Sequence, residues 1–376
     1  MPTVKNWQIG REMSYPYEDH RPVKQWCIIF DLNKCIGCQT CSIACKTTWT
    51  SGKGQEYMFW NNVESKPYGS YPMAWDVKVL EKLGTQEWNK KSAYTGKTIW
   101  EAAAPNERVV YFYPEDEDWM YPNRGEDECT GIVQHGDHIQ TPHNKWFFYL
   151  PRTCAHCTYP ACLSACPRKA VYKRDEDGIV LIDQSRCKGY QECVRACPYK
   201  KSQYNPYTRV SEKCIGCFPA VEEGFQPMCV QNCIGKIRVM GFISPPWNAR
   251  EDNPPDYLVH KKKVALPYYP QLGLEPNIYF IPPIHADINY LHQMFGPNVE
   301  EAIANYKTIQ HDPVAQGLLC LIGSTNHIID KFNVQNGLAY AYDLEGNEII
   351  NVPITEQIVV REPWDEKLQV IRTNTP

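Results

Sequence analysis

Four short groups contain all 18 cysteines of the chain except Cys27, Cys129 and Cys320. In chain order, the groups are Cys35, Cys38, Cys41 and Cys45 (group one); Cys154, Cys157, Cys162 and Cys166 (group two); Cys187, Cys193 and Cys197 (group three); and Cys214, Cys217, Cys229 and Cys233 (group four). Group one has the C-x2-C-x2-C-x3-C spacing of bacterial ferredoxins. In such a run, three thiolates bind one iron–sulfur cluster and the fourth binds the neighbouring cluster. The repeated runs therefore predict a chain that binds several clusters.

Exchange of the last cysteine should pair group one with group four and group two with group three. The predicted ligand sets are Cys35, Cys38, Cys41 and Cys233 (site one); Cys214, Cys217, Cys229 and Cys45 (site two); Cys154, Cys157, Cys162 and Cys197 (site three); and Cys166, Cys187 and Cys193 (site four). Sites one to three each have four thiolates, so we expect a 4Fe-4S cluster in each.

Site four lacks one ligand, because Tyr190 stands where group three should have its second cysteine. A cubane corner without a thiolate holds its iron poorly, so we expect a 3Fe-4S cluster with the phenol at the vacant corner. Two alternatives stay open: a 4Fe-4S cluster completed by water or phenolate, and a site without a cluster. Cluster type and charge affect reduction potential, so the tyrosine is expected to tune one site of a relay.

Other uses of cysteine fit the pattern less well. Disulfide frameworks are typical of short secreted chains, and neighbours in tight groups are poor disulfide partners. Zinc sites usually combine two separated C-x2-C pairs, or cysteine with histidine, which would leave two cysteines of each run surplus. We find no nucleophile motif, phosphate-binding loop or dinucleotide-binding glycines, so no residue is expected to be catalytic. Electron transfer is the chemistry that remains.

Several residues near or between the groups need an interpretation. His156 either donates a hydrogen bond toward cluster sulfur, which would raise the reduction potential, or simply packs. The stretch "HGDHIQTPH" (135–143) is interpreted as a loop with surface histidines rather than a metal site, and the three ungrouped cysteines as small core residues. Aromatic residues expected to exclude water from the clusters are Trp49, Trp60, Tyr159, Tyr199 and Tyr204.

Composition limits the function classes. The 376 residues include 22 glycines and 30 prolines, which favours turns over long helices. A formal net charge of -4 argues against broad nucleic-acid binding, which needs a basic face. No apolar stretch approaches the roughly 20 residues of a membrane helix. The first residues have neither a secretory pattern nor twin arginines, so the sequence shows no targeting signal of its own.

Short strands should flank the cysteine loops. Residues 25–34, "QWCIIFDLNK", and 236–243, "KIRVMGFI", are each predicted as a strand, and residues 171–183 as two strands around an Asp-Gly turn. The predicted fold class is α+β: two ferredoxin-like cluster-binding modules with short strands and helices, a long irregular insertion and an extended C-terminal tail. Much of 27–66 and 150–243 would be loop wrapped on clusters, so the chain without iron should fold poorly.

The predicted domain boundaries follow the cysteine groups. They are an N-terminal arm (1–26), a first ferredoxin-like module with groups one and four (27–65 and 200–245), an insertion (66–145), a second module with groups two and three (146–199), and a C-terminal extension for subunit contact (246–376).

In order and spacing, the four groups resemble the iron–sulfur beta subunits of the molybdenum enzymes related to dimethyl sulfoxide reductase. The non-cysteine in group three, with "LPRTCAHCTYPACLSACPRKAVYKRDEDGIVLID" and "KCIGCFPAVEEG", is similar to one subgroup. That subgroup contains respiratory nitrate reductase, perchlorate and selenate reductases, ethylbenzene dehydrogenase and nitrite oxidoreductase. The N-terminal "NWQIGREMSYPYE" and "SGKGQEYMFWNNVESKPYGSYP" are most similar to the beta subunit of nitrite oxidoreductase.

The resemblance implies a subunit that relays electrons between a molybdenum catalytic alpha subunit, which oxidises nitrite to nitrate or runs the reverse, and a haem b gamma subunit or cytochrome. The molybdenum bis-guanine-dinucleotide cofactor and the haem b would lie only on those partners, as would membrane association. Site one would face the molybdenum subunit and site four the haem side. Some relatives have aspartate as the last group-one ligand, whereas Cys45 is present here, so site two should be all thiolate.

Alternatives to this interpretation concern the complex and the compartment. The same relay could serve a nitrate, perchlorate or selenate reductase or a hydrocarbon dehydrogenase, or the chain could be a free polyferredoxin carrier. The resemblance implies export, folded, with a signal-bearing partner to the periplasm or an equivalent compartment such as the anammoxosome lumen. The alternative location is the cytoplasmic face of the membrane.

Overall fold

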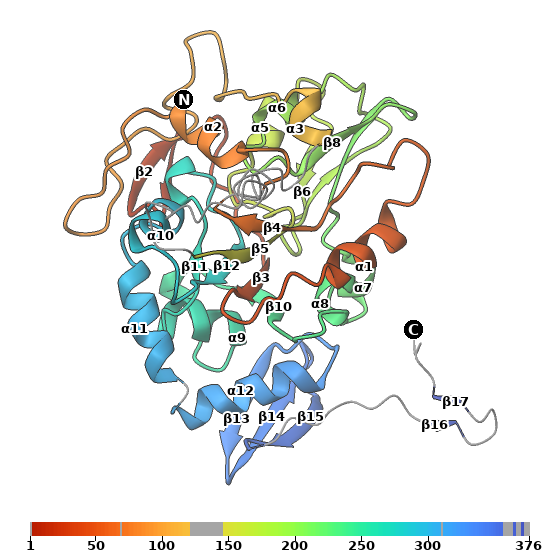
Figure 1. Cartoon of the computed structure of the whole chain (residues 1–376), viewed down its shortest axis with the longest axis vertical. Coiled ribbons are helices and arrows are strands. Elements are labelled where there is room, and N and C mark those ends of the chain that lie inside the picture. The colour runs from red at the N-terminus through yellow and green to blue at the C-terminus, as the bar shows by residue number, and fades with distance from the viewer. Residues whose placement is uncertain are drawn as a thin grey trace, which may run out of the picture.

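The computed structural model describes residues 2–67, 70–120, 146–309 and 311–355, with the backbones of 364–365 and 370–371 (Figure 1). Cys129 and the histidine stretch 135–143 lie outside the described residues, so their predicted roles stay predictions.

The central sheet joins segments that lie far apart in the sequence. Strand β3 (Gln25–Asp31) pairs antiparallel with β10 (Arg238–Ile243) on one side and parallel with β12 (Ile278–Ile281) on the other. A short strand, β11 (Leu266–Pro267), completes the order β10-β3-β12-β11. Every residue of β3 is buried, as expected for a strand with partners on both edges. The predicted strands at both ends of the cysteine region are confirmed.

Strand β12 comes from the segment that the sequence suggested as a subunit-contact extension. Its run "IYFI" is buried throughout, and its pairing with β3 makes this part of the extension a component of the core. The apolar run explains the placement, because a buried parallel strand needs apolar side chains on both faces.

Short helices and hairpins surround the cysteine loops. The helices are α1 (Thr40–Trp49), α5 (Ala161–Ala165), α6 (Glu192–Ala196), α7 (Phe218–Glu222) and α8 (Met228–Gln231). The antiparallel pairs are β4 (Asn62–Lys66) with β5 (Phe148–Arg152), β6 (Val171–Lys173) with β7 (Val180–Ile182), and β8 (Ser202–Asn205) with β9 (Val210–Lys213). The β6–β7 pair confirms the hairpin predicted around the Asp-Gly turn.

The N-terminal arm forms a hairpin of β1 (Thr3–Asn6) and β2 (Arg11–Ser14). It lies against the insertion and the C-terminal part: Arg11 pairs with Glu101 at 2.7 Å, and the Asn6 amide donates to the carbonyl of Gly273 at 2.8 Å. The described part of the insertion is mostly irregular, as predicted, but it includes α2 (Trp75–Glu81) and α3 (Asp116–Met120).

The C-terminal third adds helices and a second sheet. Its elements are η2 (Pro246–Asn248), α9 (Pro254–Asp256), η3 (Tyr257–Lys261), η4 (Pro270–Leu272), α10 (Ile288–Phe295), α11 (Val299–Ile309), α12 (Pro313–Ser324), the sheet β13 (Lys331–Gln335), β14 (Leu338–Tyr342) and β15 (Glu348–Pro353), and the pair β16 (Trp364–Asp365) and β17 (Val370–Ile371). Asp287 and Asp312 cap α10 and α12 by accepting main-chain N–H bonds.

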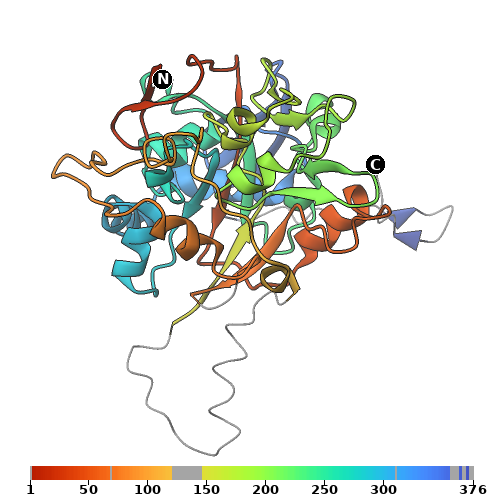
Figure 2. The same cartoon turned by 90° about the horizontal axis from the view of Figure 1, so that it is seen from above.

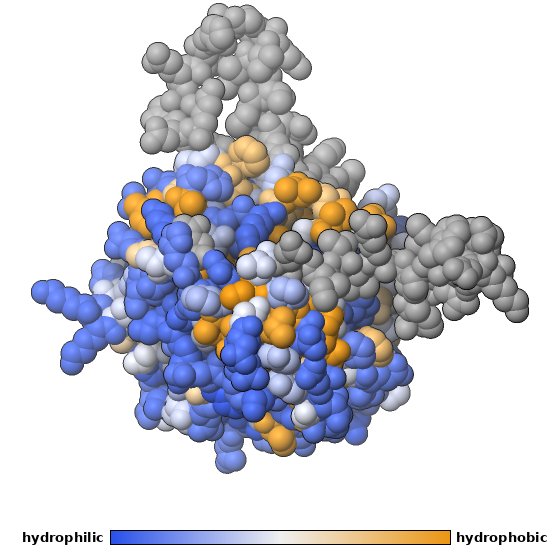
Figure 3. All heavy atoms as spheres, turned by 90° about the horizontal axis from the view of Figure 1, so that it is seen from below, coloured by the Kyte–Doolittle hydropathy of each residue, from blue (hydrophilic) through white to orange (hydrophobic). Residues whose placement is uncertain are grey.

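The arrangement leaves α1 and the pair α10–α11 on opposite sides of the central strands (Figures 1 and 2). Helix α12 and the sheet β13–β15 form one end of the molecule in Figure 1. From that end the surface is mostly polar, with apolar side chains gathered in patches (Figure 3). Within the described residues, no helix is both long and apolar enough to cross a membrane.

Candidate iron–sulfur cluster sites

The four cysteine groups share one loop conformation. In each, the residue two positions after the first cysteine has a positive φ, between 40° and 68°. These residues are Gly37, His156, Gly189 and Gly216. The left-handed backbone turns the N–H groups of the loop inward: Gly216 N lies 3.3 Å from Cys214 Sγ, and His156 N lies 3.5 Å from Cys154 Sγ. In iron–sulfur proteins, N–H groups of this kind donate hydrogen bonds to the sulfur atoms of the cluster.

The group-three loop keeps this conformation although it lacks a cysteine. Gly189 has φ 68°, and a Cβ there would lie 2.4 Å from the carbonyl oxygen of Arg209, so glycine is required. Tyr190 therefore occupies the same loop position as the second cysteine of the other groups, and its side chain is 58% exposed. The substitution changes the side chain and leaves the loop unchanged.

The last cysteines of groups two and three also follow one pattern. Cys166 and Cys197 each end a five-residue helix, and each Sγ accepts an N–H from four residues further on: Ala170 N at 3.3 Å and Lys201 N at 3.4 Å. The repeated geometry relates the two halves of this region to each other.

The structure brings the site-two cysteines together around one cavity. Cys45 of α1, Cys214, Cys217 and Cys229 all line it, and all are buried. The indole Nε1 of Trp49 donates to Cys217 Sγ at 3.2 Å. Burial and the neighbouring Cys214 raise the pKa of Cys217 to about 11. Buried thiols of this kind lose their protons when a metal supplies the compensating charge.

The site-three cysteines surround a second cavity. Its lining includes Cys154, Cys157, Cys162 and Cys197, of which only Cys197 is partly exposed. In both cavities, three of the lining cysteines come from one group and the fourth from the group predicted to exchange with it. The fourth cysteine can reach the cavity because helix α1 packs against α8, and α5 against α6.

The cysteines of site one lie nearer the surface. Burial raises the pKa of Cys35, with smaller contributions from the nearby thiols of Cys41 and Cys233, and the N–H of Gly37 and the charge of Arg238 partly offset the shift. Cys38 is exposed, whereas Cys35 and Cys233 are partly exposed.

Site four has a similar partly open setting. Cys193 is buried, and burial raises its pKa to about 11, with smaller contributions from the nearby thiols of Cys166 and Cys187 and with the Ser211 hydroxyl opposing. Cys187 Sγ accepts the N–H of Ser211 at 3.4 Å, and both Cys166 and Cys187 are partly exposed.

Proximity between the four sets defines their order. Burial raises the pKa of Cys229 of site two, and Cys41 of site one lies near enough to contribute to that shift. Cys154 of site three is in one buried cluster with Cys45 and Cys214 of site two. Cys162 of site three and Cys193 of site four belong to another buried cluster. The sets therefore lie in a row, one, two, three, four, with the middle pair enclosed.

The cavities offer hydrogen-bond donors that have no partner within the described residues. Trp26 Nε1 and Trp60 Nε1 belong to residues lining the site-two cavity, and His156 Nε2 to a residue lining the site-three cavity. His156 Nδ1 accepts the N–H of Val180 at 3.0 Å, which leaves the ring proton on Nε2. Unpaired buried donors are costly, so these sites fit an anionic occupant with acceptor atoms, as an iron–sulfur cluster is.

Buried basic side chains near the cysteines also fit an anionic cluster as the occupant of these sites. Lys213 and Lys201 both line the site-three cavity, and Arg238 donates to Cys41 Sγ at 2.7 Å. Sequence reasoning missed these three residues. Lys213 directly precedes Cys214 and Lys201 follows Cys197 by four positions, so basic residues flanking cysteine runs were a usable signal. Arg238 had no such signal, because its position depends on the pairing of β10 with β3.

Other sequence predictions concern the ungrouped cysteines and the aromatic residues near the cysteine groups. Cys27 and Cys320 are buried core residues, as predicted. Trp60, Tyr159 and Tyr199 are buried as expected of water-excluding side chains, while Trp49 also makes the hydrogen bond described above. Within the described residues, no three His, Cys, Asp or Glu side chains meet at a position suited to a single metal ion.

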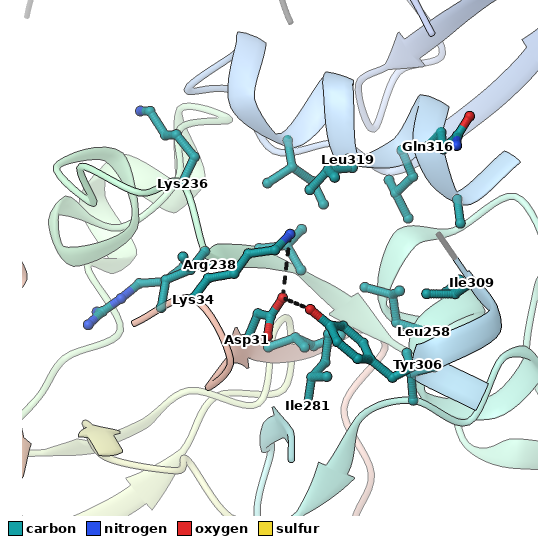
Figure 4. Close-up of a pocket in the computed structure, with 17 residues that line it drawn as sticks. Asp31, Lys34, Lys236, Arg238, Leu258, Ile281, Tyr306, Ile309, Gln316 and Leu319 are labelled. Atoms are coloured by element: carbon teal, nitrogen blue, oxygen red, sulfur yellow. Dashed lines mark hydrogen bonds and ion pairs between the residues drawn. The ribbon is translucent and has the colours of Figure 1, made fainter. Parts of the chain in front are cut away.

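A separate cavity of about 270 Å³ adjoins site one without including any cysteine. Apolar side chains of β3, β10 and α12 line most of it, with Leu258 and Ile281. Figure 4 shows Lys34 and Tyr306 meeting at Asp31 on its floor, while the Arg238 guanidinium points away from the cavity.

Comparison with known proteins adds three well-matched relatives. The selenate reductase subunit beta of Thauera selenatis is 42% identical over 311 residues, covering 75% of this chain and 89% of that one. The chlorate reductase subunit beta of Ideonella dechloratans is 42% identical over 314 residues, with the same shares covered. The respiratory nitrate reductase subunit beta of Haloferax mediterranei is 41% identical over 311 residues, covering 74% and 84%. A family model described as a 4Fe-4S dicluster domain matches residues 145–243.

The chain belongs to the iron–sulfur beta subunits of the molybdenum enzymes related to dimethyl sulfoxide reductase. The resemblance stated from the cysteine groups is thereby confirmed. This beta subunit binds iron–sulfur clusters and transfers electrons as one component of a redox enzyme complex, in which a catalytic alpha subunit is its partner.

Proposed function

We propose that the beta subunit carries three 4Fe-4S clusters, at sites one, two and three, and one 3Fe-4S cluster at site four, through the ligand sets predicted above. The observation that carries the proposal is the row of four cysteine sets, with the middle cavities lined by four cysteines each. When bound, the clusters supply one-electron redox centres. The chain contributes the thiolates, the inward N–H groups and the enclosure that excludes water from the two middle sites.

At site four, the group-three loop supports the three-iron assignment. The loop is preserved and Tyr190 takes the second cysteine position, so a phenol stands where a cubane would need a thiolate. A 4Fe-4S cluster completed by water or phenolate is the rival, and the iron count distinguishes the two.

We further propose that the electrons pass between a molybdenum alpha subunit that interconverts nitrite and nitrate and a haem b gamma subunit or cytochrome. The nitrite assignment rests on the N-terminal segments. The matched relatives equally favour a selenate, chlorate, perchlorate or nitrate reductase. On this proposal, site one faces the alpha subunit and site four the haem partner. Export to the periplasm, or an equivalent compartment, would occur with a signal-bearing partner.

We propose two ferredoxin-like modules, 27–65 with 200–245 and 146–199, as the units that hold sites one and two and sites three and four. Their supports are the packing of α1 on α8 and of α5 on α6. The described part of 246–376 contributes β12 to the core, so the subunit-contact role is proposed only for the surface of that segment.

The test is isolation of the native complex through a tag on this chain, followed by metal analysis and substrate assays. We expect molybdenum and iron to co-purify in a complex much larger than the 43.5 kDa chain, and nitrite to reduce the clusters. Reoxidation of reduced clusters by selenate or chlorate, with no response to nitrite or nitrate, would overturn the nitrite assignment. A lone chain with iron and no molybdenum would instead support a free carrier.

A further inference from the structure

Four buried cations near the cysteine sites differ from the other buried cations of the molecule. Lys66 and Arg152 are fully buried and each faces a carboxylate: Lys66 lies 2.7 Å from Asp76, and Arg152 contacts Glu64. Within the described residues, no carboxylate lies in ion-pair contact with the second set, whose members are Lys200, Lys201, Lys213 and Arg238. Burial lowers the pKa of Lys200 and of Lys201 to about 7, so these two amines need not carry a full charge. A buried charge is normally paired, so Arg238 and Lys213 must be balanced by something else.

Arg238 lies between sites one and two. Its guanidinium points away from the apolar cavity (Figure 4), and Nη2 donates to Cys41 Sγ at 2.7 Å. The thiols within electrostatic range of its charge are those of Cys35, Cys41 and Cys233 of site one and Cys229 of site two.

The Arg238 guanidinium is held in place from two further directions. It lies over the ring of Phe30 at 4.7 Å, and Nη1 donates to the Asn61 side chain at 3.3 Å. Its Nε has no partner within the described residues. The packing fixes the position of the charge, and the spare N–H leaves a donor for an acceptor in the same space.

Lys213 holds the matching position between sites two and three. Nζ donates to the main-chain carbonyl of Cys214 at 2.8 Å and to that of Val180, and the side chain lines the site-three cavity. The thiols within electrostatic range of its charge are those of Cys154 and Cys162 of site three and Cys214 of site two. One cation thus stands at each of these two junctions, and both are 3% exposed.

We propose that Arg238 and Lys213 are fixed junction cations, each raising the reduction potentials of the two clusters on either side of it. The inference rests on the proposed function, since the clusters supply the negative charge that the cations face. Reduction adds one electron to a cluster, so a nearby positive charge stabilises the reduced form. The same charge weakens the repulsion between two reduced neighbours, which keeps the electron mobile along the first three sites.

The test is a redox titration of the purified complex, followed by electron paramagnetic resonance, with iron counted for every variant. At the wild-type midpoint potential, we expect Arg238→Gln to lower the ratio of reduced to oxidised cluster about tenfold at sites one and two, which is about 59 mV for one electron. Lys213→Gln should do the same at sites two and three. Site two should respond to both variants and site four to neither.

Two kinds of control separate charge from structure. Arg238→Lys and Lys213→Arg keep the charge and should keep all midpoints near the wild-type values. Arg11→Gln removes a cation whose partner is the carboxylate of Glu101 and should move none of them.

Unmoved midpoints in the glutamine variants with full iron, or equal shifts at all four sites, would overturn the inference. If Arg238→Gln loses iron, Arg238→Lys must restore both iron and potentials; loss of iron in both would show that the residue holds the site rather than sets its potential. A wild-type chain without clusters would refute the proposed function itself, which is a different result.

Discussion

The two middle sites and the two end sites differ in how completely they are closed off from solvent. Every cysteine of sites two and three is buried except Cys197, which is partly exposed. At the ends, Cys38 and the side chains of Ile36, Ile234 and Tyr190 are exposed. Electrons must enter and leave a relay where partners can approach, whereas the middle only passes them on. The difference in burial therefore separates positions of exchange from positions of transfer.

With the proposed module boundaries, the enclosed middle is also where the two modules meet. Strands β4 and β5 pair next to sites two and three, and Glu64 of β4 accepts from Arg152 Nε of β5 at 2.7 Å. Cys154 of one module lies in one buried cluster with Cys45 and Cys214 of the other. Losing a middle site should therefore disturb both modules, and losing an end site only one.

Removal of all iron should have the largest effect. The helices of the cluster region are four to ten residues long, too short to persist without packing on a cluster. We expect chelation to abolish amide protection through residues 27–66 and 150–243, while β13–β15 with α12 retains some. Hydrogen exchange before and after chelation measures this. Uniform protection after iron loss would contradict the view that clusters organise this region.

Replacing one ligand tests the contrast between middle and end directly. Cys217→Ser in site two should lower the melting temperature and the iron content by more than one cluster, because the cavity lies where the modules meet. Cys38→Ser in site one should cost about one cluster and little stability, since that thiol is exposed. Iron counting and thermal unfolding of the two variants provide the comparison. Equal losses would show that burial does not distinguish the sites.

The next largest effect should come from disrupting the ion pair of Glu64 and Arg152 beside the two middle sites. Burial opposes ionisation of Glu64, but the charges of Arg152 and Lys66 outweigh it and hold its pKa below the usual 4.5. Glu64→Gln leaves the buried Arg152 without a carboxylate partner, whereas Lys66 keeps Asp76, and should cost about 3–5 kcal/mol of stability. Chemical denaturation of the two proteins at neutral pH checks this.

The same pair gives a pH dependence with a definite sign. A carboxylate whose pKa is lowered on folding contributes stability above its unfolded pKa and loses it as pH falls through the folded value. The wild-type protein should therefore lose stability below about pH 4.5, and Glu64→Gln should lose less over that range. Parallel curves for the two proteins would remove Glu64 from the explanation of acid lability.

The smallest expected effect concerns one hydrogen bond in the middle. Trp49→Phe removes the N–H that reaches Cys217 Sγ at 3.2 Å and keeps most of the ring. Hydrogen bonds to cluster sulfur raise the potential, so the site-two midpoint should fall by the equivalent of about 1 kcal/mol. A redox titration measures the shift, and Trp60→Phe serves as a comparison at the same cavity. A raised or unchanged midpoint would contradict the role given to this donor.

The sequence predicted the loops better than it predicted their surroundings. Cysteine spacing is local, so Tyr190 could be placed at the position of the second cysteine of group three without a structure. The strands at 25–31 and 238–243 could also be predicted from the sequence, because both are short apolar runs beside cysteine groups. The exchange of last cysteines could be proposed from spacing, because the short helix in each run places its last cysteine next to the paired group.

Tertiary pairing decided the remaining features. Nothing local in "NIYFIPPI" indicates that β12 pairs parallel with β3 about 250 residues earlier in the chain. Arg238 reaches Cys41 only because β10 lies beside β3, and neither segment alone predicts that contact. The paired charges of Glu64 and Arg152 likewise meet through strands separated by the insertion.

The central claim is a relay of four clusters in which Tyr190 marks a three-iron site, and one measurement tests it most directly. Electron paramagnetic resonance on the oxidised protein, with iron counted per chain, should give a signal near one spin per chain and about 15 irons. Tyr190→Cys should remove that oxidised-state signal and bring the count to about 16. An oxidised wild-type protein that is silent and contains about 16 irons would contradict the account, because site four would then hold a complete cubane.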